Sequence, residues 1–339
     1  MKNPLPQRQL GATELDVTSI GLGGAVIGDL YREVSEKEAV ETILAALSGG
    51  IRLIDKSPLY GSGLSEHRIG TALRHWDGDR PVLSTKIGRV ADPFAPRDPK
   101  SGYVGGLPHH LSFDYSAAGT HRSLEQSLLR LGVDRVDLVM VHDLEPAALG
   151  SDYESRFEEA IGGAVPALED LRRDGIIRGY GIGVNDADAA ERFVRAADPD
   201  FFLIAGRYSI LEQPAMKSLL PLATERGIGV LLGGVYNSGI LATGPVEGAR
   251  YNYGPAPEAI LGRVADLERF CKEQEVELRH AALQFVFGHP SVSAVVLGAA
   301  SAAEVDAQLT DFRTTLPEGF WTKLQQSGLL DEGAPLPKS

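Results

Sequence analysis

The chain has 339 residues, of which 43% are hydrophobic and 23% charged, an ordinary globular composition with material for a large core. Its formal net charge of −13 at pH 7 favours small-molecule partners over nucleic acid, because nonspecific binding of phosphate backbones needs clustered lysine and arginine. No apolar run is long enough to cross a bilayer and the start MKNPLPQRQL lacks the apolar stretch of a secretory signal, so we expect a cytoplasmic protein without a membrane partner.

The first element in chain order is a candidate hairpin. Residues Gln9 to Leu15 contain a Leu-Gly turn, and we expect this hairpin to close the lower end of a barrel. After it, short β-rich runs alternate with longer stretches of helical periodicity, which is typical of βα units around a parallel sheet. The sequence predicts eight strands, at Thr18 to Leu22, Arg52 to Lys56, Val82 to Ile87, Val136 to His142, Arg178 to Val184, Phe201 to Arg207, Gly229 to Leu232 and Ala294 to Leu297.

Helices with one apolar stripe are predicted between these strands. The stripes include Val40, Ile43, Leu44 and Leu47; Leu124, Leu128 and Leu131; and Met216, Leu219, Leu220 and Ala223. Glycines suited to a left-handed helix end follow at Gly49-Gly50, Gly132, Gly175 and Gly227. Eight strand-helix units without a Pro/Ser-rich linker predict an α/β fold, a (β/α)8 TIM barrel that forms a single domain over residues 1–339.

Several segments extend beyond these units. Gly88 to Ala118 and Tyr236 to Pro257 are long loops after the third and seventh strands, and in a barrel both lie on the catalytic face. Glu318 to Leu329 predicts an extra C-terminal helix packed across the outside. The single cysteine excludes an internal disulfide and a cysteine-based metal cluster, and we expect it to be buried in the helical series Ile260, Val264, Leu267 and Cys271.

Four polar residues fall at or just after predicted strand ends: Asp55, Tyr60, Lys86 and His142. The C-terminal ends of neighbouring barrel strands share one mouth, so we expect these side chains to converge. A phenol ordinarily has a pKa of ~10. We expect Lys86, held by Asp55, to lower the pKa of Tyr60, and His142 to hydrogen-bond the reacting oxygen. Each residue alone also has a structural interpretation, as a turn cap, a packing ring, a rim lysine or a partner of a loop carbonyl. Their shared placement favours a proton relay.

Five motifs occur in a characteristic order: GLGGAVIG (Gly21 to Gly28), LIDKSPLYGSGLSEHRIGTAL (Leu53 to Leu73), STKIGR (Ser84 to Arg89), DLVMVHD (Asp137 to Asp143) and IGVND (Ile182 to Asp186). By these motifs the chain resembles the aldo-keto reductase family over essentially its whole length. The resemblance implies that Asp55, Tyr60, Lys86 and His142 form a catalytic tetrad in which Tyr60 donates or accepts the proton. Lys56 stands where the family often has threonine and adds a positive charge beside Asp55.

Further segments narrow the resemblance to one branch of the family. They are RYSILEQ (Arg207 to Gln213), NSGILATG (Asn237 to Gly244), AALQFVFGHPSVSAVVLGA (Ala281 to Ala299) and FWTKLQQSGLL near the end. The branch contains dehydrogenases of L-fucose, D-threo-aldoses and L-galactose and a pyridoxal 4-dehydrogenase, which oxidise a cyclic hemiacetal to a lactone. The resemblance therefore implies that Tyr60 accepts the hydroxyl proton while hydride leaves for nicotinamide.

The glycines of GLGG lack the spacing of a Rossmann fingerprint. Barrel enzymes instead hold phosphate with the loops after the seventh and eighth strands, which here carry Asn237, Ser238, Gly239, Gly298 and Ser301. The resemblance adds Asn185 as the partner of the nicotinamide carboxamide, and it completes the predicted cofactor set with Gly23, Gly24, Asp55 and Gln308. Relatives often have glutamine in the sixth strand and an aromatic ring in the seventh, where this chain has Ala205 and Gly233. Either Arg207 or Tyr208 compensates for the missing ring, or both pack at the barrel rim.

The choice of cofactor is predicted from Glu304. The family often has arginine there to hold the adenosine 2′-phosphate. A carboxylate repels that phosphate and accepts hydrogen bonds from a free ribose hydroxyl, which predicts NAD, with NADP as the alternative. Glu304 also has a structural interpretation, since an acidic residue in the first turn complements the helix dipole.

Three functions are consistent with the sequence. The leading one is an NAD-dependent dehydrogenase of an aldose or pyridoxal hemiacetal; the others are an NADPH-dependent reductase of small aldehydes or ketones and a nicotinamide-binding, redox-sensing regulatory subunit. The adjacent His109 and His110 lack a third ligand of recognisable spacing, so no metal site is predicted. Tyr31 and Tyr103 lie in loops that can contact substrate, whereas Trp76 is predicted to pack. The sequence leaves open whether the protein is a monomer or a homodimer.

Overall fold

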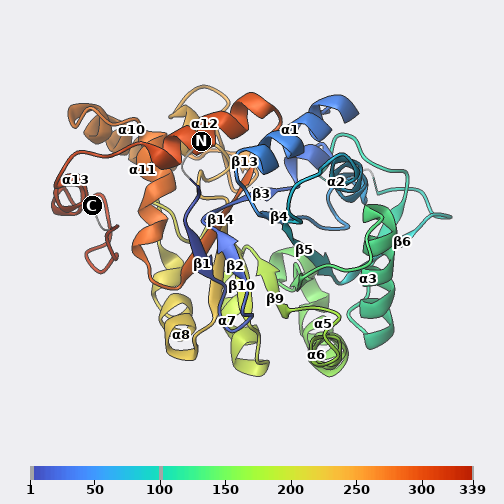
Figure 1. Cartoon of the computed structure of the whole chain (residues 1–339). Coiled ribbons are helices and arrows are strands. Elements are labelled where there is room, and N and C mark those ends of the chain that lie inside the picture. The colour runs from blue at the N-terminus through green and yellow to red at the C-terminus, as the bar shows by residue number, and fades with distance from the viewer. Residues whose placement is uncertain (1–3, 99–101, 338–339) are drawn as a thin grey trace.

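Eight parallel strands close into a barrel in the computed structural model, which describes residues 4–98 and 102–337 (Figure 1). This confirms the predicted (β/α)8 fold. The first predicted strand is divided, because β2 (Asp16–Thr18) ends at Thr18 and the barrel strand β3 begins at Ile20. In neighbour order the barrel strands are β3 (Ile20–Gly23), β4 (Leu53–Asp55), β5 (Val82–Ile87), β8 (Leu138–His142), β9 (Gly179–Val184), β10 (Phe201–Ala205), β11 (Gly229–Gly233) and β14 (Val292–Gly298), which pairs with β3.

Helices surround the strands (Figure 1). They are α1 (Glu36–Ser48), α2 (Leu64–Arg74), α3 (Ala117–Leu131), α4 (Pro146–Leu149), α5 (Tyr153–Glu159), α6 (Val165–Arg173), α7 (Ala187–Ala196), α8 (Leu219–Arg226), α9 (Ile240–Thr243), α10 (Glu258–Glu273), α11 (Leu278–Phe285) and α12 (Ala302–Arg313). Left-handed glycines stand at the predicted helix ends, at Gly50, Gly132, Gly175 and Gly227. Met216 lies outside α8, in a short 3-10 turn, η4 (Pro214–Met216), that precedes it.

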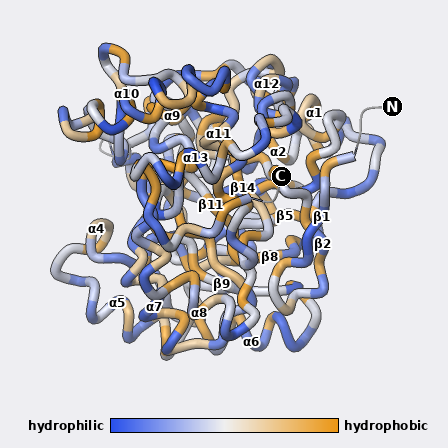
Figure 2. Tube along the Cα trace, turned by 90° about the vertical axis from the view of Figure 1, so that its left-hand side faces the viewer, coloured by the Kyte–Doolittle hydropathy of each residue, from blue (hydrophilic) through white to orange (hydrophobic). Residues whose placement is uncertain are grey.

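The apolar side chains form two buried layers. One fills the barrel and includes Leu53, Met140 and Phe201; the other packs between the strands and the helices. In Figure 2 hydrophobic segments run through the middle of the molecule, and the outer helices alternate between hydrophobic and hydrophilic segments. Successive side chains of a strand point alternately into the barrel and toward the helices, and each helix turns one apolar stripe toward the strands. Together these side chains form the two layers.

The predicted N-terminal hairpin pairs β1 (Gln7–Gln9) with β2 and closes the N-terminal end of the barrel. Its Leu10 and Val17 are fully buried among the side chains that fill the barrel. Gly11 has a φ of +52°, and a Cβ there would collide with the backbone of Asp200 and Gly229. Only glycine therefore fits where the hairpin turn meets the strand ends.

The C-terminal helix α13 (Phe320–Gln326) is shorter than predicted and packs beside α10 and α11 (Figure 1). The Phe320 ring lies 5.8 Å from that of Phe270, and the Trp321 ring 6.2 Å from that of Phe285. Cys271 is buried on α10, as its helical series predicts. In the described part of the chain no helix is long and apolar enough to cross a membrane.

The two long loops carry strands of their own. The loop after β5 contains the antiparallel pair β6 (Arg89–Asp92) and β7 (His110–Phe113), and the loop after β11 contains β12 (Arg250–Tyr251) and β13 (Gly254–Pro255). Both loops supply side chains to the cavities at the C-terminal ends of the barrel strands. Both loops therefore lie at the C-terminal ends of the barrel strands, as the sequence analysis expected.

Candidate active site

The structure brings Asp55, Lys86 and Tyr60 into direct contact. Asp55 ends β4, Lys86 lies near the end of β5, and Tyr60 follows β4 in a turn. The three hydrogen-bond donors of the Lys86 ammonium all have acceptors: Asp55 Oδ2 at 2.6 Å, the Lys56 carbonyl at 3.0 Å and the Tyr60 hydroxyl at 3.0 Å. The other carboxylate oxygen of Asp55 accepts from Ser84 Oγ at 3.0 Å. Lys86 is thus held in one orientation, with one N–H aimed at the phenol oxygen.

The pKa of Tyr60 is opposite in direction to the sequence-based prediction. Burial raises the pKa of this phenol well above its ordinary value, and the negative charge of Asp55 adds to the effect. A buried phenolate would lose its hydration, and this cost outweighs the proximity of Lys86. The hydroxyl is therefore protonated at neutral pH.

His142, at the end of β8, is neutral and held from both sides. Burial lowers the pKa of its imidazole to about 3. Its Nδ1 lies 2.9 Å from Ser57 Oγ and its Nε2 lies 3.3 Å from Asp143 Oδ1. Since the Asp143 carboxylate can only accept, Nε2 carries the proton and Ser57 donates to Nδ1. The ring stands edge-on to that of Tyr60, with their centroids 5.9 Å apart.

Asp143 is a feature of the site that the sequence analysis did not single out. It follows His142 with a left-handed φ of +50°, and its Oδ2 pairs with the Arg89 guanidinium at 2.9 Å. Burial alone would raise the pKa of this carboxyl, but the His142 ring and Arg89 outweigh burial and lower it. Because His142 is neutral, we attribute the ionisation of Asp143 at neutral pH to Arg89. The motif DLVMVHD contains this residue but does not reveal its conformation.

Two adjoining hollows meet at Tyr60. A cavity of about 420 Å³ is lined by Tyr60, Lys86, His142 and Asp143, together with Tyr31 and Tyr103 from the loops. A groove of about 340 Å³ runs from Tyr60 and Asp55 toward the loops after β11 and β14. The predicted contact of Tyr31 and Tyr103 with a substrate cavity is consistent with this arrangement. Trp76 instead stacks with Arg52 and donates to the carbonyl of Asp79.

Most of the predicted cofactor residues line the groove. They are Gly23, Asp55, Asn185, Asn237, Ser238, Gly239 and Gly298. Gly24 packs instead against Ser65 and the Asp55 carbonyl. Gln308 reaches the groove indirectly, since it donates to the Gly298 carbonyl at 2.8 Å.

Ser301 and Glu304 act as helix caps at the N-terminus of α12. Ser301 Oγ accepts from the Glu304 amide at 3.3 Å, and the Glu304 carboxylate accepts from the Ala300 amide at 2.9 Å. These contacts agree with the structural interpretation of Glu304, in which an acidic residue in the first turn stabilises the start of the helix. The exposed carboxylate also places a negative charge at the helix end beside Gly298.

The groove fits a nicotinamide dinucleotide. Asn237 and Ser238 adopt left-handed φ angles of 45° and 60°, and a Cβ on the neighbouring Gly239 would meet open space. The buried Oδ1 of Asn237 has no hydrogen-bond partner among the residues that the structure describes. A strained loop with an unpaired buried acceptor and a small open residue is suited to close approach of a polar ligand.

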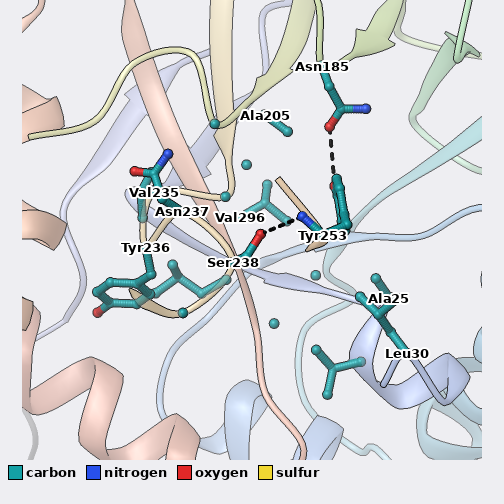
Figure 3. A pocket seen from close by; sticks show the side chains of 18 of the residues that line it. Ala25, Leu30, Asn185, Ala205, Val235, Tyr236, Asn237, Ser238, Tyr253 and Val296 are labelled. Carbon is teal, nitrogen blue, oxygen red and sulfur yellow. Dashed lines mark hydrogen bonds between the residues drawn. The ribbon is translucent and has the colours of Figure 1, made fainter. Parts of the chain in front are cut away.

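Asn185 is held in place for one end of that ligand. Its backbone N–H and side-chain Nδ2 donate to the two carboxylate oxygens of Glu145, at 2.7 and 3.0 Å. In Figure 3 the Tyr253 side chain extends across the groove to Asn185, whose Oδ1 accepts from the Tyr253 hydroxyl at 3.2 Å. The Tyr253 amide in turn donates to Ser238 Oγ at 3.0 Å. Tyr253 was not predicted; its place in the loop after the seventh strand was the available signal.

Neither residue proposed to replace the missing ring faces the groove. Tyr208 is buried against the rings of Phe285 and His289. Arg207 donates to the Asn185 carbonyl at 2.6 Å and so supports the backbone at the groove. Ala205 and Gly233 line the groove as expected, and Tyr253 is the aromatic side chain that extends across it (Figure 3).

Lys56 does not touch the Asp55 carboxylate. Its fully buried side chain leaves the strand on the opposite face, and its ammonium donates to the Ser84 carbonyl at 3.0 Å. Burial lowers the pKa of Lys56 to about 8, against the opposing influence of Glu66 and Asp55. The positive charge that Lys56 adds beside Asp55 therefore acts without direct contact between the two side chains.

His109 and His110 are separated by the local structure. His110 begins β7 and pairs with Asp92 across the hairpin, whereas His109 precedes this strand. Within residues 4–98 and 102–337, no group of three histidine, cysteine or acidic side chains is placed to hold a metal ion.

Comparison with known proteins agrees with this geometry. The profile of the Aldo/keto reductase family matches residues 19–328. The chain is 38% identical over 335 residues to a pyridoxal 4-dehydrogenase of Microbacterium luteolum, covering 96% of this chain and 98% of that protein. It is 36% identical to a D-threo-aldose 1-dehydrogenase of a Pseudomonas species, covering 94% and 96%. Among solved structures, the aldo-keto reductase AKR11C1 from Bacillus halodurans in its holo form superimposes with a TM-score of 0.74 at 25% identity, covering 97% and 98%.

Proposed function

Since the chain belongs to the aldo/keto reductase family, whose members are nicotinamide-dependent oxidoreductases, we propose that it oxidises the cyclic hemiacetal of an aldose or of pyridoxal to a lactone with NAD. One observation carries the proposal. The hydroxyl of Tyr60, fixed by Lys86, lies where the substrate cavity and the cofactor groove meet. A carbon held there is within reach of both a proton acceptor and a hydride acceptor.

The groove residues would hold the cofactor in two places. Asn185, fixed by Glu145, would bind the nicotinamide carboxamide, and the loop of Asn237, Ser238 and Gly239 would bind the pyrophosphate. The nicotinamide ring, when bound, supplies the acceptor for the hydride. The similarity to dehydrogenases of pyridoxal and of D-threo-aldoses supports the substrate class.

The tetrad would move the proton of the anomeric hydroxyl. Tyr60 accepts that proton as phenolate, Lys86 stabilises the phenolate, and Asp55 holds Lys86. The neutral His142 would share its Nε2–H between Asp143 Oδ1, 3.3 Å away, and the same substrate oxygen. Each of these groups needs little movement because its neighbours already fix it.

A second function is favoured by the pKa of Tyr60. Burial keeps this phenol protonated at neutral pH, and a protonated phenol is the form that donates to the oxygen of a carbonyl being reduced. The second candidate is therefore reduction of small aldehydes or ketones with NADPH or NADH. The convergence of four polar groups at one cavity argues against a regulatory subunit that only binds the cofactor.

The deciding experiment is a substrate panel with the purified protein. L-Galactose, L-fucose and pyridoxal are each tested with NAD and NADP, and small aldehydes with NADPH, by the absorbance of the reduced nicotinamide. The product is identified by mass spectrometry. We expect a lactone with NAD. Turnover of aldehydes with NADPH, and of no hemiacetal, would replace the proposal with the reductase.

A further inference from the structure

The carboxylate of Asp143 faces the substrate cavity that Tyr60 and His142 also line. Its left-handed backbone is a conformation that side-chain-bearing residues rarely adopt and that aspartate and asparagine tolerate best. The Asp143 amide is fixed in this position by a hydrogen bond to the Gly183 carbonyl at 3.0 Å. The chain therefore departs from the strand direction directly after His142, and this departure places the carboxylate at the cavity wall.

Arg89 fixes this carboxylate without covering it. One guanidinium nitrogen lies 2.9 Å from Asp143 Oδ2, and the guanidinium carbon lies 4.3 Å from the centre of the Phe113 ring. The Arg89 side chain is 11% exposed and that of Asp143 14%. The hairpin β6–β7, which carries both Arg89 and Phe113, thus serves as a rigid support for Asp143.

The carboxylate keeps unused acceptor capacity. An ionised carboxylate offers about four lone-pair positions. Oδ2 uses one toward Arg89 and Oδ1 one toward His142. The neighbouring carboxylate of Asp55, which lines the adjoining groove, is occupied by Lys86 and Ser84. Among the described residues that line the cavity, Asp143 is therefore the ionised acceptor available to a ligand.

We propose that Asp143 determines substrate specificity by accepting hydrogen bonds from hydroxyl groups other than the reacting one. The inference rests on the proposed function and names the substrate class as hemiacetals that carry further hydroxyl groups. A hydroxyl of a sugar ring and a hydroxyl of the pyridoxal ring can each donate such a hydrogen bond to the carboxylate. An unsubstituted hemiacetal leaves the ionised acceptor unpaired and is bound less well.

The test compares hemiacetals that carry further hydroxyl groups with one that has none. L-Galactose and pyridoxal are each compared with 2-hydroxytetrahydropyran, a six-membered hemiacetal with the reacting hydroxyl alone, using the wild type, Asp143→Asn and a control. Asparagine tolerates the left-handed backbone, so the substitution removes the charge and keeps the loop. The control is Asp134→Asn, whose side chain is 82% exposed in the turn before β8, at the opposite end of the barrel.

We expect Asp143→Asn to lower kcat/KM for L-galactose or pyridoxal relative to 2-hydroxytetrahydropyran by about 10- to 100-fold, mainly through KM, because a charge-assisted hydrogen bond is lost. Asp134→Asn should keep the wild-type ratio. The substrate whose ratio falls identifies the sugar or the pyridoxal as the source of the hydroxyl. An unchanged ratio for both, with the wild type active, would overturn the role of Asp143 alone. A wild type that oxidises none of the three hemiacetals would overturn the proposed function, and with it this inference.

Discussion

The ammonium group of Lys86 lies 3.0 Å from the hydroxyl of Tyr60, yet the pKa of that phenol is raised. Lys86 donates its other two hydrogen bonds to Asp55 and to the Lys56 carbonyl. The negative charge of Asp55 therefore offsets much of the stabilisation that the ammonium group would give a phenolate. Proximity to a cation is therefore not enough to make Tyr60 acidic, because burial and the charge of Asp55 oppose it.

Replacing Tyr60 with phenylalanine tests the proton relay directly. The ring keeps its packing while the hydroxyl bound by Lys86 is lost. We expect kcat to fall by roughly 10²- to 10⁴-fold, the usual contribution of a general acid or base, with little change in folding. Steady-state kinetics with far-UV circular dichroism checks both. Tyr208→Phe is the matched control, since its hydroxyl is buried outside the cavity; equal losses in the two variants would contradict the assignment.

The pKa of Tyr60 also predicts a pH dependence. Oxidation requires the phenolate, and the raised pKa keeps the phenol protonated near neutral pH. The rate of hydride transfer in the oxidative direction should therefore rise with pH without levelling off near neutrality. His142, with a pKa of about 3, adds no transition in that range. Single-turnover rates across the neutral and alkaline range would show this, and a plateau reached near neutral pH would refute it.

The contact between Glu145 and Asn185 predicts an effect on cofactor binding. Glu145→Gln leaves one acceptor oxygen where two are needed, so one of the two Asn185 hydrogen bonds is lost. We expect KM for the cofactor to rise by roughly tenfold, the value of one hydrogen bond to a charged group. Fluorescence titration with NADH checks the binding. The exposed Glu158→Gln is the control, and equal affinity in both variants would count against the role of Asn185.

The charge of Glu304 predicts a preference for NAD. The carboxylate caps α12 at Ala300 and would repel a 2′-phosphate near that helix end. We expect Glu304→Arg to raise the ratio of kcat/KM for NADP over NAD by at least about tenfold, near 1.4 kcal/mol. Glu304→Gln removes the charge and keeps an acceptor for the Ala300 amide. Its ratio of kcat/KM for NADP over NAD should therefore lie between those of the wild type and Glu304→Arg. A wild type that strongly prefers NADP would contradict the prediction.

The buried Lys56 predicts a gain in stability when it is replaced. Burial lowers the pKa of Lys56 from the ordinary 10.5 to about 8, so the unfolded chain binds this proton more tightly than the folded one. Stability therefore rises with pH across that interval, and the charged form costs about 3 kcal/mol near pH 7. After loss of the hydrogen bond to Ser84, worth about 1 kcal/mol, Lys56→Met should gain about 1–2 kcal/mol near pH 7. Urea unfolding at about pH 7 and about pH 10 should show the gain shrinking with pH; a loss at both would contradict it.

The sequence alone determined the architecture and the convergence of Asp55, Tyr60, Lys86 and His142 at one end of the barrel. Strands and helices follow from the spacing of apolar residues over a few positions, and Asp55, Lys86 and His142 stand at strand ends that any closed parallel barrel brings to one mouth. The alternation of side chains along a strand also predicts that Lys56 and Asp55 point to opposite faces, a step that the sequence analysis did not take.

The tertiary structure decided the electrostatics of the site. The pKa of Tyr60 depends on how completely segments far apart in sequence bury it, which the residue types at the strand ends do not show. The approach of Tyr253 to Asn185 and the turn of Asp143 toward Arg89 depend on the path of long loops. Burial and loop path result from packing across the whole chain, so the sequence places the reacting groups, while the fold sets their protonation and the partners they offer to a ligand.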